Sequence, residues 1–338
     1  MADSVDGVDA VGAPEGSAAE VRRRPWWRGK AMRTTVAVVI IGVVGYFFGK
    51  SLADNWDNLR EEDLSLGWWA VAATVAFVIA VAISGTLWGG IVRRLDPTPV
   101  SSTEAVRVHF SSWLLKYVPG QVGFVLNKVV WGQKRGVSRL VILISVVYEN
   151  AFLLLGSTVP MIAILAIARG GSLELSGTVW LALAAMVPLA AATHPAVFHR
   201  VVSTLGKRTL KRDVPRDLFL PFGVTMRYQV AFLLPRIVNG VGITVIAVAL
   251  ADAAPESWVP LTAAYAIAGA VGIMAVFVPS GLGVREAVFV LFAAPYIGTE
   301  KAIVVSLVAR VLATIADALI AGVYGILTLQ TRKTRQQS

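Results

Sequence analysis

Long apolar runs alternate with short polar segments along most of this chain. Helices are expected at about 34–49, 67–92, 140–168, 177–198 and 300–328, and within the stretch 217–252, where Pro221 and Pro235 kink or interrupt the start. A helix needs about 20 mostly apolar residues to cross a bilayer core of about 30 Å. The pattern therefore predicts an all-α polytopic membrane protein with about six transmembrane helices.

Two further apolar segments, 104–132 and 259–297, are interrupted at related positions. Residues 117–123 read YVPGQVG and residues 277–283 read FVPSGLG, which share aromatic, Val, Pro, small, any, aliphatic, Gly. Proline removes a backbone donor, and glycine adopts dihedral angles that other residues avoid. In lipid, interrupted backbone is tolerated only where protein buries it or where it lines a polar cavity. The two phrases indicate an internal duplication, with a chance match as the alternative.

The distribution of Lys and Arg gives the orientation. Basic residues concentrate in 21–33, 93–94, 134–139, 200–216 and 332–335, and they are sparse in 50–66, 169–176, 253–258 and 298–301. Cytoplasmic loops carry the excess of Lys and Arg. Every Lys- and Arg-rich loop is cytoplasmic, and every poor one is outside, if the amino terminus is inside and each interrupted segment returns to the side of the membrane from which it entered. We therefore predict two re-entrant helical hairpins in an inverted repeat, with both termini cytoplasmic, in the plasma membrane.

Composition agrees with a membrane protein and narrows its chemistry. Hydrophobic residues make up 56% of the chain, the mean hydropathy is +0.68, and Cys is absent. There is no thiol nucleophile, and we find no nucleotide loop or metal-ligand spacing, so no cofactor is expected. The formal charge of +10 favours anionic lipid at the inner face rather than nucleic acid.

We expect one membrane domain between two tails. Residues 1–21 are acidic, small and without periodicity, as in a disordered tail. The membrane domain covers 22–330, and its first helix reads as an uncleaved signal anchor. Residues 331–338 form a basic cytoplasmic tail.

Two charged residues fall inside apolar helices at matching positions. Glu149 follows Pro119 by 30 residues, and Arg310 follows Pro279 by 31. A charge at mid-bilayer costs about 2.5–3.5 kcal/mol on insertion scales, so it is rarely idle. Either Glu149 and Arg310 form a buried salt bridge across the pseudo-axis that fixes helix packing, or they line a polar pathway. Asp317 lies two turns beyond Arg310 on the same helix.

The residues around the two breaks suit an anion. A helix that restarts after the second break points free N–H groups and a positive dipole end at the tip, where Arg285 adds a charge. The alternative is that Arg285 and Glu286 pair with each other or with neighbouring charges. For Lys116 and Lys128, snorkelling to the interface is the simpler interpretation. The predicted headgroup pathway comprises Pro119, Gly120, Gly123, Asn127, Lys128, Glu149, Pro279, Ser280, Gly281, Gly283, Arg285, Glu286, Arg310 and Asp317.

Other polar residues are given structural roles. Ser102 or Thr103 is the expected cap of the helix that contains Glu104. Trp113 reads as part of an interfacial aromatic belt, and His109 as structural or interfacial. Arg236 follows Pro235 deep in an apolar run, which makes it a weaker candidate for the pathway.

At these residues the chain resembles a known family. Residues 117–120 with Gly123, the acid Glu149, residues 279–286 (PSGLGVRE) and Arg310 look like the membrane region of lysylphosphatidylglycerol synthases and related flippase-like proteins. The resemblance covers about 34–328. It implies movement of a lipid between leaflets, which this region is thought to perform in the two-part synthases. We expect no aminoacyl-transferase domain, hence no enzyme activity, because the sequence ends ten residues after the last helix.

Three functions remain open. The leading hypothesis is a lipid translocator for an anionic or modified phospholipid, or for a polyprenyl-phosphate-linked lipid. The alternative is a non-catalytic membrane partner of a separately encoded lipid-modifying enzyme or glycosyltransferase, which would dock on 200–216. A transferase that acts on lipid itself is weakest, because no nucleophile or metal set is visible.

Overall fold

Every element in the described part of the chain is helical. The computed structural model describes residues 67–117, 122–170, 196–200, 203–204, 215–275 and 283–337, together with His194 and Gly281. The elements are α3 Gly67–Leu95, α4 Ser102–Leu114, η2 Leu115–Tyr117, α5 Val122–Lys134, α6 Arg139–Gly170, η4 Arg216–Leu218, α9 Phe222–Ala231, α10 Leu233–Ala251, α11 Pro255–Met274, α12 Val284–Ile297 and α13 Thr299–Gln337.

Several of these helices are long and apolar enough to cross a bilayer. The described residues hold four such candidates, which are α3, the combined α9–α10 segment Phe222–Ala251, α11, and Thr299–Leu329 of α13. The prediction of a polytopic α-helical membrane protein is therefore confirmed. The predicted helices at 34–49 and 177–198 fall outside the described residues.

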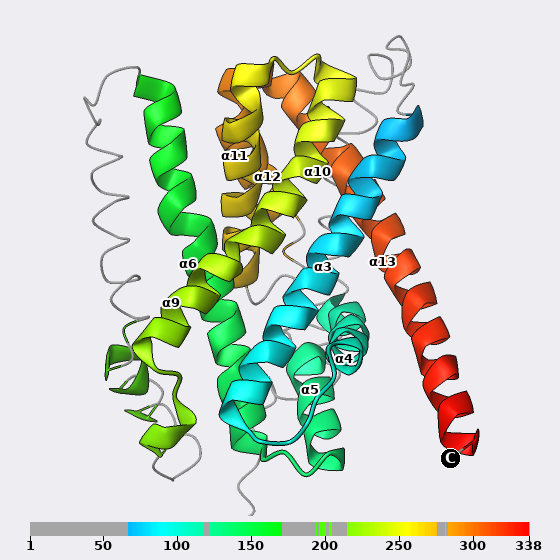
Figure 1. The fold of residues 1–338 in the computed structure, drawn as a ribbon. Helices are drawn as coiled ribbons and strands as arrows, with labels where there is room; N and C mark the ends of the chain where they lie inside the picture. The colour runs from blue at the N-terminus through cyan, green and yellow to red at the C-terminus, as the bar shows by residue number, and fades with distance from the viewer. Residues whose placement is uncertain are drawn as a thin grey trace, which may run out of the picture.

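The first interrupted segment forms a pair of short helices. α4 and α5 have 13 residues each, about 20 Å at 1.5 Å per residue, which is less than the bilayer core of about 30 Å. In Figure 1 the pair lies in the lower half of the molecule, where α3 ends and α6 begins. The connection between η2 and α5, which contains Pro119 and Gly120, lies outside the described residues.

The second interrupted segment forms a pair at the opposite end. α11 has 20 residues and α12 has 14. α10 and α11 meet at the top of Figure 1, and α13 descends from the same end. The break between α11 and α12 includes Gly281 and Gly283, both with positive φ. We call α3 to α6 the first half and α9 to α13 the second half.

Three details of the elements differ from the sequence-based prediction. The cap of α4 is Ser101, one residue before those expected, and its Oγ accepts from the Glu104 N–H at 3.1 Å. α13 does not end near 328 but continues to Gln337. The stretch 217–252, expected to contain one helix, is divided at Phe232 into α9 and α10.

One apolar core joins the two halves. Buried side chains from α3, α10, α11, α12 and α13 pack in a single cluster that includes Phe77, Ile243, Tyr265, Phe289 and Val305. Tyr265 stacks on Phe77 with ring centroids 6.1 Å apart. Since Phe77 belongs to the first half and the other four to the second, the halves are packed as one body around Tyr265.

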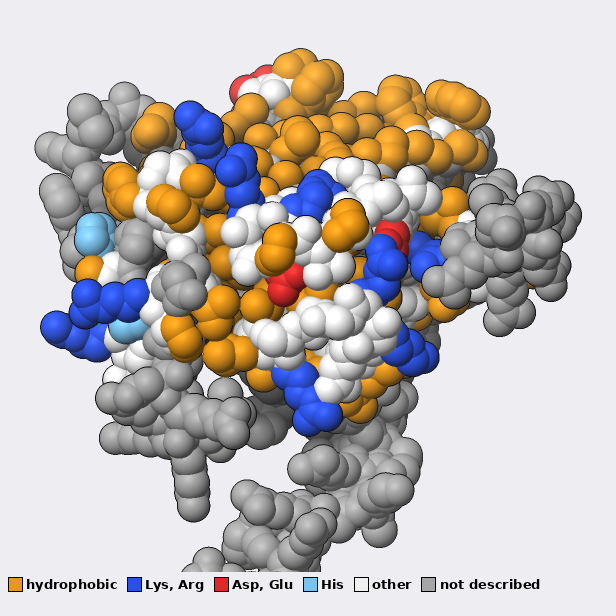
Figure 2. All heavy atoms as spheres, turned by 60° about the horizontal axis from the view of Figure 1, so that its bottom comes forward, with side chains coloured by type: hydrophobic (Ala, Val, Ile, Leu, Met, Phe, Trp, Pro, Cys, Tyr) orange, Lys and Arg blue, Asp and Glu red, His pale blue; other side chains and the backbone are white. Residues whose placement is uncertain are grey.

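The two ends of the molecule carry different charges. At the lower end of Figure 1, where α3 and α5 end and α6 begins, Arg93, Arg94, Lys134, Arg135 and Arg139 are exposed. Figure 2 looks onto this end and shows Lys and Arg spread around it among hydrophobic side chains and uncharged white atoms. At the upper end, Asp252, Glu256 and Glu300 are exposed.

Two glycines on α3 let α4 lie directly against it. Gly85 and Gly89 are four residues apart and therefore share a face, which is the small-xxx-small spacing of close helix packing in membranes. A Cβ at Gly85 would stand 2.8 Å from the His109 Cβ and 3.2 Å from the Val106 Cα, and one at Gly89 would meet Ala105. The contact sets the position of His109.

Replacing Gly85 with alanine should separate these two helices. We expect Gly85→Ala to lower the free energy of unfolding by about 1–3 kcal/mol, because the new methyl group overpacks a tight contact. Denaturant titration in detergent would measure the change. Gly322→Ala on α13 is the matched control, since no atom lies within 4 Å of its Cβ position. Equal stability of the two variants would contradict the close packing.

Candidate functional site

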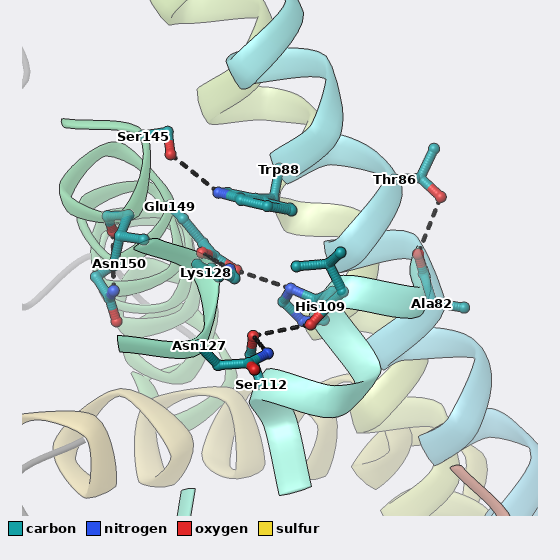
Figure 3. A network of polar contacts seen from close by, with 12 residues as sticks. Ala82, Thr86, Trp88, His109, Ser112, Asn127, Lys128, Ser145, Glu149 and Asn150 are labelled. Carbon is teal, nitrogen blue, oxygen red and sulfur yellow. Dashed lines mark hydrogen bonds and ion pairs between the residues drawn. The ribbon is translucent and has the colours of Figure 1, made fainter. Parts of the chain in front are cut away.

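The first half buries an ion pair between α5 and α6. Lys128 Nζ lies 2.5 Å from Glu149 Oε2, and the two side chains are 0% and 1% exposed. His109 of α4 brings its Nδ1 to 3.3 Å from Glu149 Oε1 and is also buried. Figure 3 shows Lys128, Glu149 and His109 converging from three helices. An acid and two bases thus meet out of contact with solvent.

Aromatic and hydroxyl side chains enclose this ion pair. Lys128 Nζ lies over the rings of Trp88 and Phe124, 4.2 and 4.1 Å from their centroids. Such cation–π contacts partly replace the hydration that burial removes. The Trp88 Nε1–H donates to Ser145 Oγ at 3.0 Å, which fixes the indole between α3 and α6. The Lys128 ammonium is therefore held in place by two aromatic faces and one carboxylate.

Asn127 serves a different purpose beside that pair. Its Nδ2 donates to Ser111 Oγ at 2.8 Å and to Ser112 Oγ at 2.9 Å, so it links α5 to α4. Gly123, one turn earlier, is the second residue of α5. Asn127 thus acts within the first helix pair and holds α4 and α5 together.

Three sequence-based interpretations change at this site. Glu149 pairs with Lys128 and Arg310 pairs with Glu286, so the expected bridge between Glu149 and Arg310 is wrong. Lys128 does not snorkel to the interface, because its ammonium is fully buried against Glu149. His109, to which no site role was given, joins the cluster. The sequence shows that His109 lies on the same face of its helix as Trp113, four residues later. It does not show that Glu149, on another helix, is the partner of His109.

In the second half, Glu286 holds the start of α12. Its Oε2 accepts from the Gly283 N–H at 2.7 Å, which satisfies the backbone donor of the residue before α12. Its Oε1 lies 3.8 Å from Arg310 Nη1 on α13. Arg285 does not pair with its neighbour Glu286; its guanidinium lies over the Tyr265 ring, 4.2 Å from the centroid. One carboxylate thus serves both the helix cap and Arg310.

The two halves also meet through charged groups. Lys116 Nζ, at the end of the first helix pair, lies 2.7 Å from Asp317 Oδ2 on α13. The Trp113 Nε1–H donates to Asp317 Oδ1 at 2.8 Å. Trp113 and Lys116 thus each have a partner in the other half, which the sequence-based interpretation did not include. Asp317, rather than Arg310, makes the charged contact across the halves.

The two ion pairs occupy comparable places with opposite polarity. In each half, the second helix of the interrupted pair contacts the long helix that follows it. The cation Lys128 is on α5 and the acid Glu149 on α6, whereas the acid Glu286 is on α12 and the cation Arg310 on α13. The predicted site residues Pro119, Gly120, Pro279 and Ser280 fall outside the described residues.

Arg236 adds a further buried cation to the second half. It lies near the start of α10, is 8% exposed, and donates from Nη2 to the Leu153 carbonyl at 3.5 Å. Arg285 is near enough for the two charges to interact. The same applies to Lys116 with Arg285 and Arg310. These cations and their acid partners extend from the connection between α4 and α5 to α10. We call them the connected set, which comprises Lys116, Arg236, Arg285, Glu286, Arg310 and Asp317.

This arrangement defines a class of protein. Several apolar helices are long enough to span a bilayer, and charged side chains that would be costly in lipid lie between two interrupted helix pairs and the long helices beside them. The sequence model of the lysylphosphatidylglycerol synthase TM region matches residues 34–321. The chain belongs to that family of multi-pass membrane proteins, as its motifs suggested. The comparison with curated proteins gives no match.

Proposed function

We propose that this protein is a non-catalytic lipid translocator that moves a lipid with an anionic headgroup between the leaflets of the plasma membrane. The family membership supports a role in lipid modification or flipping. The observation that carries the proposal is the set of buried charges that links the two halves through Lys116 and Asp317. Charges at this depth are costly, and transporters use them to offer a polar path to a headgroup.

In this proposal the two interrupted pairs are re-entrant hairpins of an inverted repeat. The two pairs lie toward opposite ends of the molecule in Figure 1, which supports this. So do α4 and α5, because each is too short to span a bilayer. Together with the two predicted helices outside the described residues, α3, α6, the α9–α10 segment and α13 would make six transmembrane helices. In this proposal α11, although long enough to cross a bilayer, belongs to the second hairpin. Interrupted helices meeting near the midplane are a recurring plan for substrate sites.

The charge distribution supports a cytoplasmic location for the lower end of Figure 1. Exposed arginines and lysines gather there, as Figure 2 shows, and cytoplasmic ends carry the excess of Lys and Arg. α13 ends on the same side, so the carboxyl terminus is cytoplasmic in this proposal. Anionic lipid of the inner leaflet would be attracted to this end.

The ion pairs suggest how a headgroup would be accepted. A phosphate oxygen that approaches Arg310 competes with Glu286, and one that approaches Lys116 competes with Asp317. Because Lys116 and Asp317 belong to different halves, an anion that takes the place of Asp317 loosens the contact between them. The acyl or prenyl chains would remain in the bilayer. Headgroup binding and separation of the halves are thereby coupled.

Reconstitution in liposomes tests the function. We expect proteoliposomes to expose fluorescent phosphatidic acid, an anionic lipid, from the inner leaflet to an external quencher, whereas protein-free liposomes keep about half of it protected. Arg310→Ala should slow exposure at least about tenfold, since a charged hydrogen bond to phosphate is lost. Arg227→Ala, at an exposed arginine of α9, is the matched control.

Two results would contradict the proposal. One is that the wild-type protein exposes no anionic lipid, including a prenyl phosphate, faster than protein-free liposomes do. The other is a wild-type rate in an Arg310→Ala protein whose thermal unfolding is unchanged. The first result, together with co-purification of a cytosolic enzyme, would favour the alternative role as a membrane partner.

A further inference from the structure

One face of α11 receives two guanidinium groups. Tyr265, Gly269 and Gly272 are four and three residues apart and share that face. Arg285 lies over the Tyr265 ring, and its Cβ is 3.5 Å from the Cβ position of Gly272. Arg236 brings its Nη1 to 2.7 Å from the Cβ position of Gly269, so only glycine leaves it this room. The small residues of α11 thus admit both arginines beside Tyr265.

These two arginines have no acid partner in the described part of the chain. No carboxylate there forms an ion pair with Arg236 or Arg285, and the Arg236 Nε is buried without any hydrogen-bond partner. The nearby Glu286 is already engaged by the Gly283 N–H and Arg310. Arg236 is buried and Arg285 is partly buried, and two such like charges that interact with each other are unfavourable unless an anion joins them.

The charges of the connected set do not cancel. Lys116 pairs with Asp317 and Arg310 pairs with Glu286, whereas Arg236 and Arg285 form no ion pair with a described residue. Four formal positive charges face two negative ones, so the set has an excess of two. The separate cluster of Lys128 and Glu149 contributes no excess. A ligand that neutralises the set would carry two negative charges.

We propose that Arg236 and Arg285 form the two arms of a site for a phosphomonoester group, and that the lipid bearing it is a lipid monophosphate. A phosphomonoester carries about −1.5 to −2 charge at pH 7 and offers three acceptor oxygens. The planar guanidinium groups bind such oxygens with two parallel hydrogen bonds each. This inference rests on the proposed function and narrows its substrate.

The same charge count disfavours other headgroups. A phosphodiester such as phosphatidylglycerol carries a single negative charge and would leave one cation of the set uncompensated. An aminoacylated phosphatidylglycerol adds an ammonium group and would meet an already cationic site. The excess of two positive charges thus separates this chain's substrate from an aminoacylated lipid.

A pair of matched probes tests the charge requirement. The full chain in nanodiscs of neutral phosphatidylcholine is titrated calorimetrically with dodecyl phosphate and with its methyl ester, which has the same alkyl chain and one charge less. Empty nanodiscs are the blank. We expect dodecyl phosphate to bind at least about tenfold more tightly, because it adds charge-assisted hydrogen bonds to the second arginine. Equal affinities would overturn the proposal.

Variants assign the preference to the two arms. Arg236→Gln should reduce the preference to less than about threefold, with Arg227→Gln as control. Gly269→Ala keeps both charges but pushes the Arg236 guanidinium aside, so it should weaken dodecyl phosphate binding selectively, whereas Gly322→Ala should not. An unchanged preference for dodecyl phosphate in Arg236→Gln would overturn the proposal. If Arg236→Gln does not fold, Gly269→Ala tests the same site independently.

Two further comparisons separate the related hypotheses. Inorganic phosphate should bind much more weakly than dodecyl phosphate; equal affinity would identify a free-phosphate site and overturn the lipid assignment. The binding preference is measured apart from flipping. If the protein shows the binding preference but does not flip lipid, the phosphomonoester site stands and the proposed function is wrong. If it flips lipid without the preference, only the phosphomonoester site is wrong.

Discussion

Lys128→Ala is expected to destabilise the protein by about 3–5 kcal/mol. The substitution leaves the Glu149 carboxylate buried without its cation, and removing one partner of a buried pair costs this much. Lys128 also fills the space between Trp88 and Phe124, so its loss removes two cation–π contacts and leaves a cavity. Titration with a denaturing detergent, followed by far-UV circular dichroism, would measure the change.

The double variant distinguishes the charge from the packing. Lys128→Met with Glu149→Leu removes both charges and keeps similar side-chain volume, and such replacements of a buried pair are often neutral or stabilising. We expect it to regain most of the stability lost in Lys128→Ala. If the double variant is as unstable as the single one, packing rather than the ion pair holds α5 on α6. If Lys128→Ala is as stable as the wild type, the pair is not buried as described.

Gly281→Ala is expected to cost about 2–5 kcal/mol and to stop translocation. Gly281 has a φ of +63°, where a side chain costs about 1–2 kcal/mol. Its Cβ would also stand 2.8 Å from the Cα and 3.0 Å from the carbonyl oxygen of Gly272. Backbone cannot swing away as a side chain does, so overpacking adds about 1–3 kcal/mol. Thermal unfolding and the liposome assay measure the two effects.

Gly136→Ala separates backbone strain from the close approach. Gly136 has a φ of +78° but no atom within 4 Å of its Cβ position, and it lies in the turn after α5. It should lose only the strain and should keep wild-type translocation. Equal losses in the two variants would mean that the contact of Gly281 with Gly272 adds nothing. Full translocation by Gly281→Ala would separate this break from the substrate path.

The hairpin geometry explains which charged pairs could have been foreseen. Residues equally far from a turn between antiparallel helices lie at the same depth, because both helices rise 1.5 Å per residue. Glu286 and Arg310 are each 12 residues from Gly298, and Arg236 and Gly269 are nearly equidistant from the turn after α10. The sequence contained this signal for Glu286 with Arg310. Matching positions in two repeats instead suggested Glu149 with Arg310, and that was wrong.

Other contacts had no such signal. Lys116 and Asp317 are 201 residues apart and meet because the end of the first helix pair packs on α13. His109 reaches Glu149 because Gly85 lets α4 approach α3 closely. A sequence gives the face of a helix on which a residue lies, but several neighbouring helices can cover that face. The choice among them depends on packing that no local pattern encodes.

The sequence by itself determined the class of this protein, the long helices, the two interruptions and the presence of charges within apolar segments. These follow from local rules, because lipid demands apolar runs and satisfied backbone, and because proline and glycine interrupt helices wherever they occur. Only the tertiary structure decided the partners of those charges. Glu149 pairs with Lys128 instead of Arg310, and Arg236 of α10 lies with Arg285 of α12 against α11. Coulomb interactions fall with distance in space rather than along the chain, so the pairing of charges is fixed only when the helices are packed.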